Sequence, residues 1–168
     1  PDVGAFFAEA MMNLRPWVLW SSDGTPAEGT LEVLDVLEHV IRRNPLHPGA
    51  NHYYIPAVEA SKNPERALPS AYRLGALMPG AGHMVHMPSH IYQRIGRYAD
   101  AIESNRLAVT ADEDYIAQCR AQGLYPMGYY PHNVHFLWFA AGADGQSKVA
   151  IEAAHKVAPR VEEAQLAQ

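Results

Sequence analysis

The sequence has few of the features that characterise disulfide-rich, nucleic-acid-binding or membrane-spanning proteins. Its 168 residues contain one cysteine, Cys119, which excludes an internal disulfide framework and a cysteine-rich zinc site. Only 18% of the residues are charged, the formal net charge is −5, and basic residues form no patch, so nothing supports binding to nucleic acid. No apolar run approaches the roughly 18 residues that suggest a membrane-spanning helix.

The short motifs of several enzyme classes are also missing. The sequence has no HisGluXxxXxxHis zinc motif, no glycine-rich phosphate loop and no Gly-Xxx-Ser-Xxx-Gly nucleophile elbow. Cys119 is a potential nucleophile, but nothing in the helix register brings it near a histidine. Whether the protein is an enzyme stays open at this stage, and a non-enzymatic role is favoured.

The bulk composition is that of an ordinary globular domain. Hydrophobic residues make up 48% of the chain, and the length is sufficient for one domain with a good core. The first residue is Pro1, inside an apolar stretch, so we interpret the chain as a piece of a longer protein in which a signal peptide cannot be assessed. We expect a soluble protein and favour the cytoplasm.

The chain does contain many helix-length segments separated by proline and glycine. Apolar residues recur at helical spacing in these segments, and few stretches alternate as strands do. Thr30 is a good candidate for the N-cap of the second segment. We therefore predict an all-α fold of antiparallel helix pairs, with more than half of the residues in helices over about 3–14, 30–43, 50–60, 64–77, 83–95, 98–120, 132–141 and 146–157.

Histidines recur at fixed positions of a repeating pattern. Ala67 and Ala101 align with a register of 34 residues, and the next step, from Ala101 to Ala150, is 49 residues, or 34 plus an insertion of 15. In this frame His52, His86 and His135 occupy one position of three successive repeats, and His83 and His132 share another, three residues earlier. Stacked repeats place equivalent positions in a row along one face.

The period and its small residues resemble a tetratricopeptide repeat. Gly96, Tyr98, Ala101 and Ala108 stand where that motif has Gly, Tyr, Ala and Ala, and Pro79 stands at the proline that closes the preceding repeat. The strings HisProGlyAlaAsnHisTyrTyr and GlyHisMetValHisMetProSerHisIleTyr are similar to those of a group of bacterial tetratricopeptide proteins. The resemblance implies one domain over 1–168, a right-handed α-solenoid of three to four repeats: a degenerate one near 1–45, then 48–81, 82–115 and 131–158, with an insertion at 116–130.

The insertion carries two expectations of its own. Tyr115, Ile116 and Cys119 continue the apolar spacing of the preceding helix, so we expect that helix to run on to about Arg120. The following segment, 123–131, is rich in tyrosine, glycine and proline, and we expect it to fold over the mouth of the groove as an ordered loop, because its aromatic rings need burial.

The resemblance also implies which residues line the concave groove. The groove positions of the first helices hold histidine repeatedly, and helical geometry independently places residues at offsets of 3 and 7 on one face. Pro88 and Pro56 depart from the family pattern, and proline inside a helix kinks or restarts it. Six histidines are predicted to converge, His52, His83, His86, His90, His132 and His135, with Tyr53, Glu59, Tyr92, Gln93, Arg94 and Phe139 as further groove residues.

Two functions remain open for this groove. Tetratricopeptide repeats usually bind a peptide or protein partner, and the resemblance favours that scaffold role. The alternative is a metal-binding protein or a metal-dependent hydrolase, because clustered neutral imidazoles suit Zn, Cu or Ni, with Glu59 as a further ligand or as a partner of one. A single histidine on a helix is more often half-buried and hydrogen-bonded for structural reasons, and only the repetition favours a common site.

Overall fold

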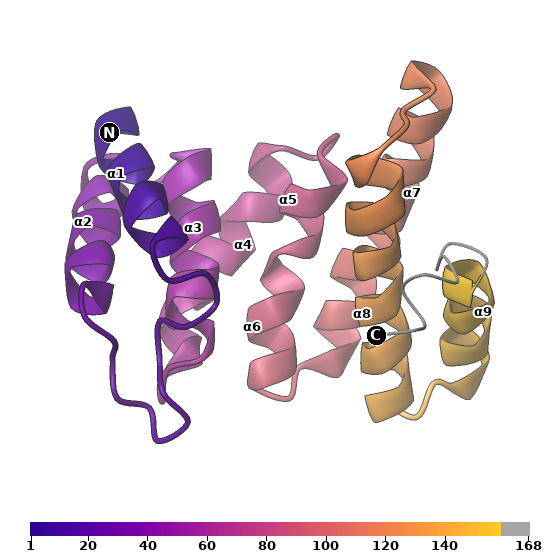
Figure 1. Cartoon of the computed structure of the whole chain (residues 1–168). Helices are drawn as coiled ribbons and strands as arrows, with labels where there is room; N and C mark the ends of the chain where they lie inside the picture. Colours follow the sequence, from indigo (N-terminus) through magenta and orange to yellow (C-terminus); the bar gives the residue numbers. More distant parts are fainter. Residues whose placement is uncertain (159–168) are drawn as a thin grey trace.

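The computed structural model describes residues 1–158, and helices are the only regular elements in that part of the chain. Well over half of the described residues are helical, which confirms the predicted all-α class. Figure 1 shows the helices standing side by side across the molecule, from α1 at one end to α9 at the other. They are α1 (Asp2–Asn13), α2 (Thr30–Arg43), α3 (Pro48–Glu59), α4 (Leu68–Leu77), α5 (Gly82–His86), α6 (Pro88–Arg94), α7 (Tyr98–Cys119), α8 (Tyr130–Ala143) and α9 (Ser147–Val157).

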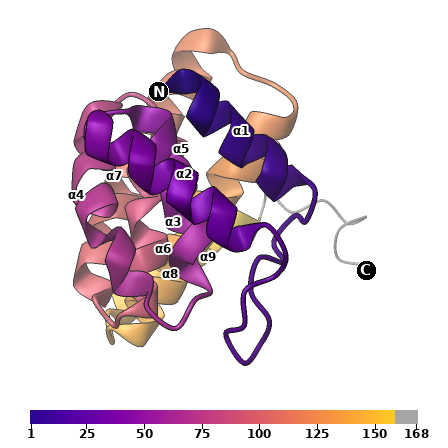
Figure 2. The same ribbon diagram turned by 90° about the vertical axis from the view of Figure 1, so that its left-hand side faces the viewer.

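Consecutive helices pack against each other, α4 also packs against α6 and α5 against α7, and three further contacts join helices that are not consecutive. Each helix contacts the next one in the chain, and Figure 2, seen from the α1–α2 end, shows the others stacked behind that pair. In addition α1 packs against α3, α3 against α6, and α5 against α8. These contacts link α1, α3, α5, α6 and α8, and the histidines of interest lie on four of these helices, α3, α5, α6 and α8.

Local sequence explains how the elements begin. At α3 the ring of His47 caps the helix, because its Nδ1 accepts a hydrogen bond from the backbone N–H of Ala50 at 3.1 Å, and Pro48 follows in the first turn. At α2 the N-cap is Gly29, in the left-handed region at φ 83°, and not Thr30 as predicted. The Thr30 hydroxyl instead donates to the carbonyl of Leu19 at 2.8 Å, which ties the loop 14–29 to this helix.

The helix predicted over 83–95 is divided in two. Pro88 lacks a backbone N–H and cannot continue the hydrogen-bond ladder, so α5 ends at His86 and α6 begins at Pro88. α5 lies very close to α7, since a Cβ atom on Gly82 would stand 1.9 Å from Oδ1 of Asp112 and 2.8 Å from the carbonyl oxygen of Ala108. Glycine at this position is therefore needed for the two helices to approach.

The insertion extends α7 and then folds back as a short π-helical turn. α7 ends at Cys119, and Arg120 takes up a left-handed conformation at φ 47°, which confirms the predicted extension of this helix. The turn Tyr125–Tyr129 then leads directly into α8. The Tyr125 hydroxyl donates to Oδ1 of the buried Asp112 at 2.6 Å, so the turn is fixed to α7. The segment expected to be a loop is thus mostly helical, and it is partly buried, since Tyr130 is in the core and Tyr129 is exposed.

The core between these helices is made of aliphatic and small side chains. Leu37, Ile55, Leu74, Ile91 and Ile102 are among the largest fully buried residues. Alanines fill the closest helix contacts, for example between α8 and α9. No helix within residues 1–158 combines the length and apolar character that crossing a bilayer requires.

Candidate metal centre

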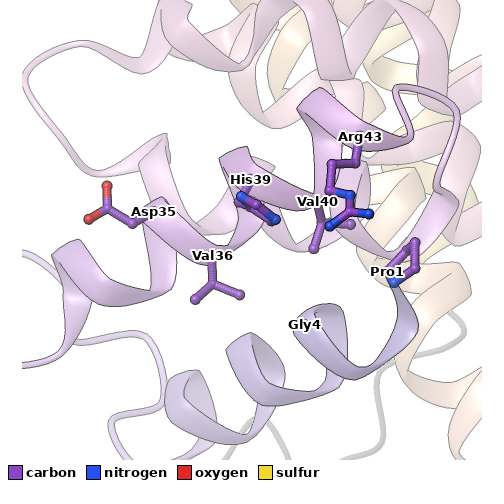
Figure 3. Close-up of a pocket in the computed structure, with 7 residues that line it drawn as sticks. All are labelled: Pro1, Gly4, Asp35, Val36, His39, Val40 and Arg43. Carbon is purple, nitrogen blue, oxygen red and sulfur yellow. The ribbon is translucent and has the colours of Figure 1, made fainter.

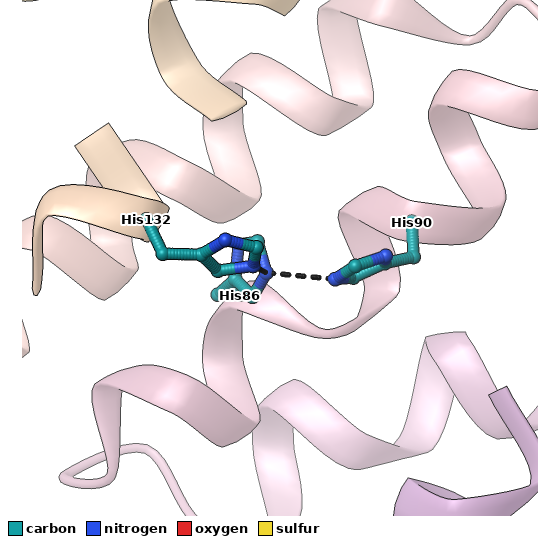
Figure 4. A group of neighbouring side chains, drawn as sticks. All are labelled: His86, His90 and His132. Carbon is teal, nitrogen blue, oxygen red and sulfur yellow. Dashed lines mark hydrogen bonds between the residues drawn. The ribbon is translucent and has the colours of Figure 1, made fainter. Parts of the chain in front are cut away.

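Three histidine side chains from three helices meet at one point. His86 comes from the end of α5, His90 from α6 and His132 from the first turn of α8 (Figure 4). The Nε2 atom of His86 lies 3.0 Å from Nε2 of His90 and 3.1 Å from Nε2 of His132. Ligand atoms of all three rings lie within 4.8 Å of one another, and we call these residues the histidine triad.

These distances are close to those that a shared metal ion imposes. Zinc binds imidazole nitrogen at about 2.0–2.1 Å, and in a tetrahedral centre this places two ligand nitrogens about 3.3 Å apart. The two short Nε2 separations in the triad are within a few tenths of an ångström of that value. A divalent ion between His86 and either of its partners therefore requires only small shifts of these rings, and the ligand atoms of all three lie within 4.8 Å of one another.

The outer nitrogen of His86 has a fixed role. Its Nδ1 lies 2.7 Å from Oδ1 of Asn105, while the Asn105 side-chain N–H₂ donates to the carbonyl of Ala101 at 2.7 Å. Because that bond assigns the oxygen of the amide to the histidine side, Nδ1 of His86 must be the donor. The neutral ring then has its lone pair on Nε2, which is the nitrogen that faces the other two rings.

The outer nitrogen of His90 is held by a carboxylate. Nδ1 of His90 lies 3.0 and 3.1 Å from the two carboxylate oxygens of Glu59, so this nitrogen also donates. His90 in its neutral form therefore also presents a lone pair on Nε2, and the two lone pairs of His86 and His90 face each other across 3.0 Å. Two acceptors repel at this distance, and a cation between them, either a proton or a metal ion, converts the repulsion into attraction.

Burial strengthens the preference for metal over protons. His86 is fully buried, and burial together with the neighbouring His90 holds the pKa of its imidazole well below the usual range. Burial and the same neighbour lower the pKa of His132 to about 4. Both rings are therefore neutral at physiological pH, and the neutral ring is the form that binds metal.

A second pair of histidines lies beside the triad. Nε2 of His52 and Nε2 of His83 are 3.1 Å apart, and the ring of His83 stacks at 6.0 Å from that of His86. Burial is the main cause that lowers the pKa of each to about 4. Nδ1 of His83 is buried without a hydrogen-bond partner among the described residues, which distinguishes this pair from the triad.

Both groups of histidines border a pocket of about 650 Å³. His90 and His132 of the triad face it, and so do His52 and His83, whereas His86 lies behind them in the core. The walls come from α1, from the loop 14–29, from α3 and from the segment 124–129 that leads into α8. The predicted ordered loop therefore does contribute to the mouth of the pocket.

The other predicted groove residues divide into two sets. Tyr53 and Glu59 line the pocket, and burial and a hydrogen bond with Glu9 raise the pKa of the Tyr53 phenol to about 12. The remaining residues lie elsewhere. His135 and Phe139 are exposed, and the ring of His135 lies 5.1 Å from that of Trp138. Tyr92 is buried under Arg97. Gln93 donates a hydrogen bond to the carbonyl of Phe136, and Arg94 donates one to the carbonyl of Glu59.

Two important contacts of the triad were missed by the sequence analysis. Asn105 is a fully buried amide on α7. It lies at helical spacing from Ala101, Ala108 and Asp112, and this spacing could have identified Asn105 as a buried position. Phe136 packs against all three rings of the triad, with centroid distances of 4.7, 4.4 and 4.7 Å to His86, His90 and His132. Its spacing of four residues after His132 places it on the same face of α8.

A second, smaller pocket of about 390 Å³ lies between α1 and α2 (Figure 3). Its lining includes Asp35, His39 and Arg43 along α2, and Gly4 on α1. A Cβ on Gly4 would stand 2.7 Å from the Val40 side chain, so the pocket is a crevice beside a close helix contact. No group of metal-ligating side chains gathers there among the described residues.

Comparisons with known proteins leave the assignment to the site itself. No protein-family model, no curated protein and no solved structure matches the chain. The features available for a functional argument are therefore the histidine triad, the bonds that orient it, and the pocket that it borders.

Proposed function

We propose that the protein binds a divalent transition metal ion through Nε2 of His86, His90 and His132. The observation that carries this proposal is the convergence of three imidazoles, two of which, His86 and His90, have their outer nitrogens already engaged. Metal-ligating histidines usually donate their other N–H to a carboxylate, a carbonyl oxygen or water, which fixes the tautomer and the ring orientation. Glu59 and Asn105 supply these partners for His90 and His86.

Zinc is the ion that best fits this set of ligands. Three histidines with room for a fourth ligand form one of the known arrangements of zinc sites that bind water or substrate. Copper and nickel also accept imidazole, so they are competitors for the same nitrogens. Cys119, the one thiol of the chain, is exposed at the end of α7 and offers no additional soft ligand to this centre.

The surrounding fold is proposed to be a tetratricopeptide-like solenoid. The contacts of α1 with α3, of α3 with α6 and of α5 with α8 support a stack of helix pairs in which the first helices form one face. A right-handed twist of this stack makes that face concave and brings the histidines of successive repeats together. In this arrangement the repeats are the frame, and the metal ion is held between repeats and not within one.

Elemental analysis of purified protein without a polyhistidine tag is the direct test. We expect about one equivalent of zinc per chain, removable by a chelator and restored by added Zn²⁺. The His132→Ala variant should lose the metal. The His135→Ala variant provides a matched control, since His135 lies three residues further along the same helix but is exposed and stacks on Trp138.

The result that contradicts the proposal is equally specific. If wild-type, His132→Ala and His135→Ala proteins bind Zn²⁺ with the same affinity, the triad is a structural cluster and not a metal centre. Circular dichroism of each variant checks that the helical fold persists.

A scaffold role in the same groove is a second candidate. It is supported by the exposed side chains of Trp17 and Leu124, which border the pocket with 90% and 75% of their surfaces accessible and offer apolar contacts to a peptide. Peptide binding that is unchanged in the His86→Ala variant and after removal of metal would favour this role over the metal centre.

A further inference from the structure

We infer that an uncharged organic molecule with an aromatic ring binds at this site. One donor atom of the molecule occupies the open coordination position of the metal ion, and its ring fills the adjoining pocket. This inference rests on the proposed function, because the ion supplies one of the two attachment points. It also assigns a class of ligand to the pocket, on the basis of the residues that line it.

The size of the pocket favours a small molecule. Its volume of about 650 Å³ lies within the range of roughly 300–1,000 Å³ that is typical of small-molecule sites. Two of the three proposed metal ligands, His90 and His132, are among its lining residues. A ligand bound to the ion on this side therefore extends directly into the pocket.

The walls of the pocket favour an apolar and planar ligand. Aromatic rings from three separate segments line it: Trp17 and Trp20 from the loop 14–29, Tyr53 from α3, and Tyr129 from the turn before α8. Leu124 and Met12 complete apolar surfaces on opposite sides. Flat rings can stack on such walls, and removal of apolar surface from water stabilises the complex.

Charge in the pocket disfavours anions. Glu9 and Glu59 are part of the lining, and within residues 1–158 none of the lining side chains is a lysine or an arginine. A phosphate or carboxylate group placed away from the ion would meet two carboxylates and no compensating cation. The ligand class is therefore a neutral molecule with one donor atom for the metal and a ring system for the walls.

The pair His52 and His83 also lines this pocket. The ring of His83 also packs edge-to-face on Tyr129 at 4.9 Å, which places a further flat surface next to the triad.

Spectroscopy of the Co²⁺-substituted protein tests the inference with two probes that share one donor. Imidazole and 4-phenylimidazole both offer a neutral nitrogen to the ion, and only the second has a ring to fill the pocket. We expect both to change the visible spectrum of bound Co²⁺, with 4-phenylimidazole binding at least tenfold more tightly. A carboxylate on the phenyl ring should remove most of that advantage.

A variant at the rim of the pocket sharpens the test. Leu124→Ser removes an apolar wall contact from a residue that touches no metal ligand, so it should reduce the preference for 4-phenylimidazole severalfold and leave the affinity for imidazole unchanged. His135→Ala, on the outside of α8, should leave both affinities as they are.

The outcomes separate this inference from the proposed function. Failure to bind Co²⁺ at all overturns the proposed metal centre, and the inference falls with it. A cobalt spectrum that responds equally to imidazole and 4-phenylimidazole, or that does not respond to either, retains the metal centre and overturns the inference. A carboxylated probe that binds more tightly than the neutral one also overturns it.

Discussion

The histidine triad and the pair His52–His83 look alike in their closest contacts and differ in what lies behind them. In both groups Nε2 atoms approach one another to 3.0 or 3.1 Å. In the triad, Nδ1 of His86 and Nδ1 of His90 are bonded to Asn105 and Glu59. In the pair, Nδ1 of His83 is buried and has no partner within the described residues.

This difference shows which histidines are held in the orientation that a metal ligand needs. A ring with one nitrogen bonded to an acceptor has its tautomer and orientation fixed, and its other nitrogen is a ready ligand. A ring without such a partner can rotate or change tautomer at little cost. Close contact between imidazoles alone therefore does not identify a metal centre, and the bonds at Nδ1 of His86 and His90 are what favour the triad over the pair.

The largest effect that we predict separates the two groups directly. His86→Ala removes the central ligand, and we expect zinc affinity to fall by more than about 100-fold, beyond the range associated with loss of a ligand's outer partner. His83→Ala, from the same helix, should change that affinity by less than about threefold, since it removes no ligand. Competition with a chromophoric chelator at pH 7.5 measures both affinities.

Equal losses in His86→Ala and His83→Ala would break the distinction between the triad and the pair. The ion would then lie between the two groups, with His83 as one of its ligands. A loss in His83→Ala alone would move the centre to the pair.

The next prediction concerns the carboxylate behind His90. Glu59→Gln keeps the size of the side chain and removes the charge that orients His90, so we expect zinc affinity to fall about 10- to 100-fold. Glu9→Gln is the matched control, because Glu9 lines the same pocket without a hydrogen bond to the triad. Isothermal titration with Zn²⁺ compares the two, and an unchanged affinity in Glu59→Gln would contradict the proposed role of the carboxylate.

Much of the helix arrangement was predictable from spacing and punctuation. Proline and glycine mark the ends of the elements, and the predicted helix 98–120 matches α7, Tyr98–Cys119. Offsets of 3 and 7 placed His83, His86 and His90 together, and this grouping persists even though Pro88 divides the helix. The bend at the proline brings Nε2 of His86 and His90 together, and a pattern of residues alone does not give its angle.

The composition of the site depended on packing that spacing does not specify. His135 and Phe136 lie on either side of the line through His132 on α8, and the rotation of that helix decides which of them faces the triad. The structure turns Phe136 inward and leaves His135 exposed against Trp138. The pocket walls from the loop 14–29 have no helical period, so no pattern predicted their contribution.

The pH dependence of stability without metal is a prediction for both groups together. Burial lowers the pKa of His52, His83 and His132 to about 4, and it lowers the pKa of His86 well below its usual value. Because these pKa values are lower in the folded chain than the ordinary 6.5, the associated stability is present above pH 6.5 and is lost as the pH falls toward 4. We expect Tm in the presence of chelator to fall steadily over this interval.

Other groups around the histidines modify this trend without reversing it. Burial raises the pKa of the Asp112 carboxyl group, so this group makes the folded protein more stable as the pH falls. It is a single group, and the four buried histidines have the opposite effect. Glu9 raises the pKa of His52, and Glu59 raises the pKa of His132. Both effects are smaller than the lowering of these pKa values by burial. A Tm that stays constant between pH 6.5 and 4.5 would show that the rings are solvated and not buried.

The smallest predicted effect concerns the outer nitrogen of His83. A buried polar atom without a partner costs about 1–3 kcal/mol, so replacing His83 by Leu removes that penalty while keeping most of the packing. The exposure of His52 to the pocket lets water satisfy its Nε2 in the variant. Because the same substitution also removes the hydrogen bond between His52 and His83, the two effects oppose each other, and we expect the free energy of unfolding of His83→Leu, measured with chelator present, to differ from wild type by less than about 1 kcal/mol. His86→Leu should instead be destabilised by about 1–3 kcal/mol, because Oδ1 of Asn105 loses its donor in the core. Equal destabilisation by the two leucine variants would mean that Nδ1 of His83 is as firmly bonded as Nδ1 of His86, and the contrast between the triad and the pair would disappear.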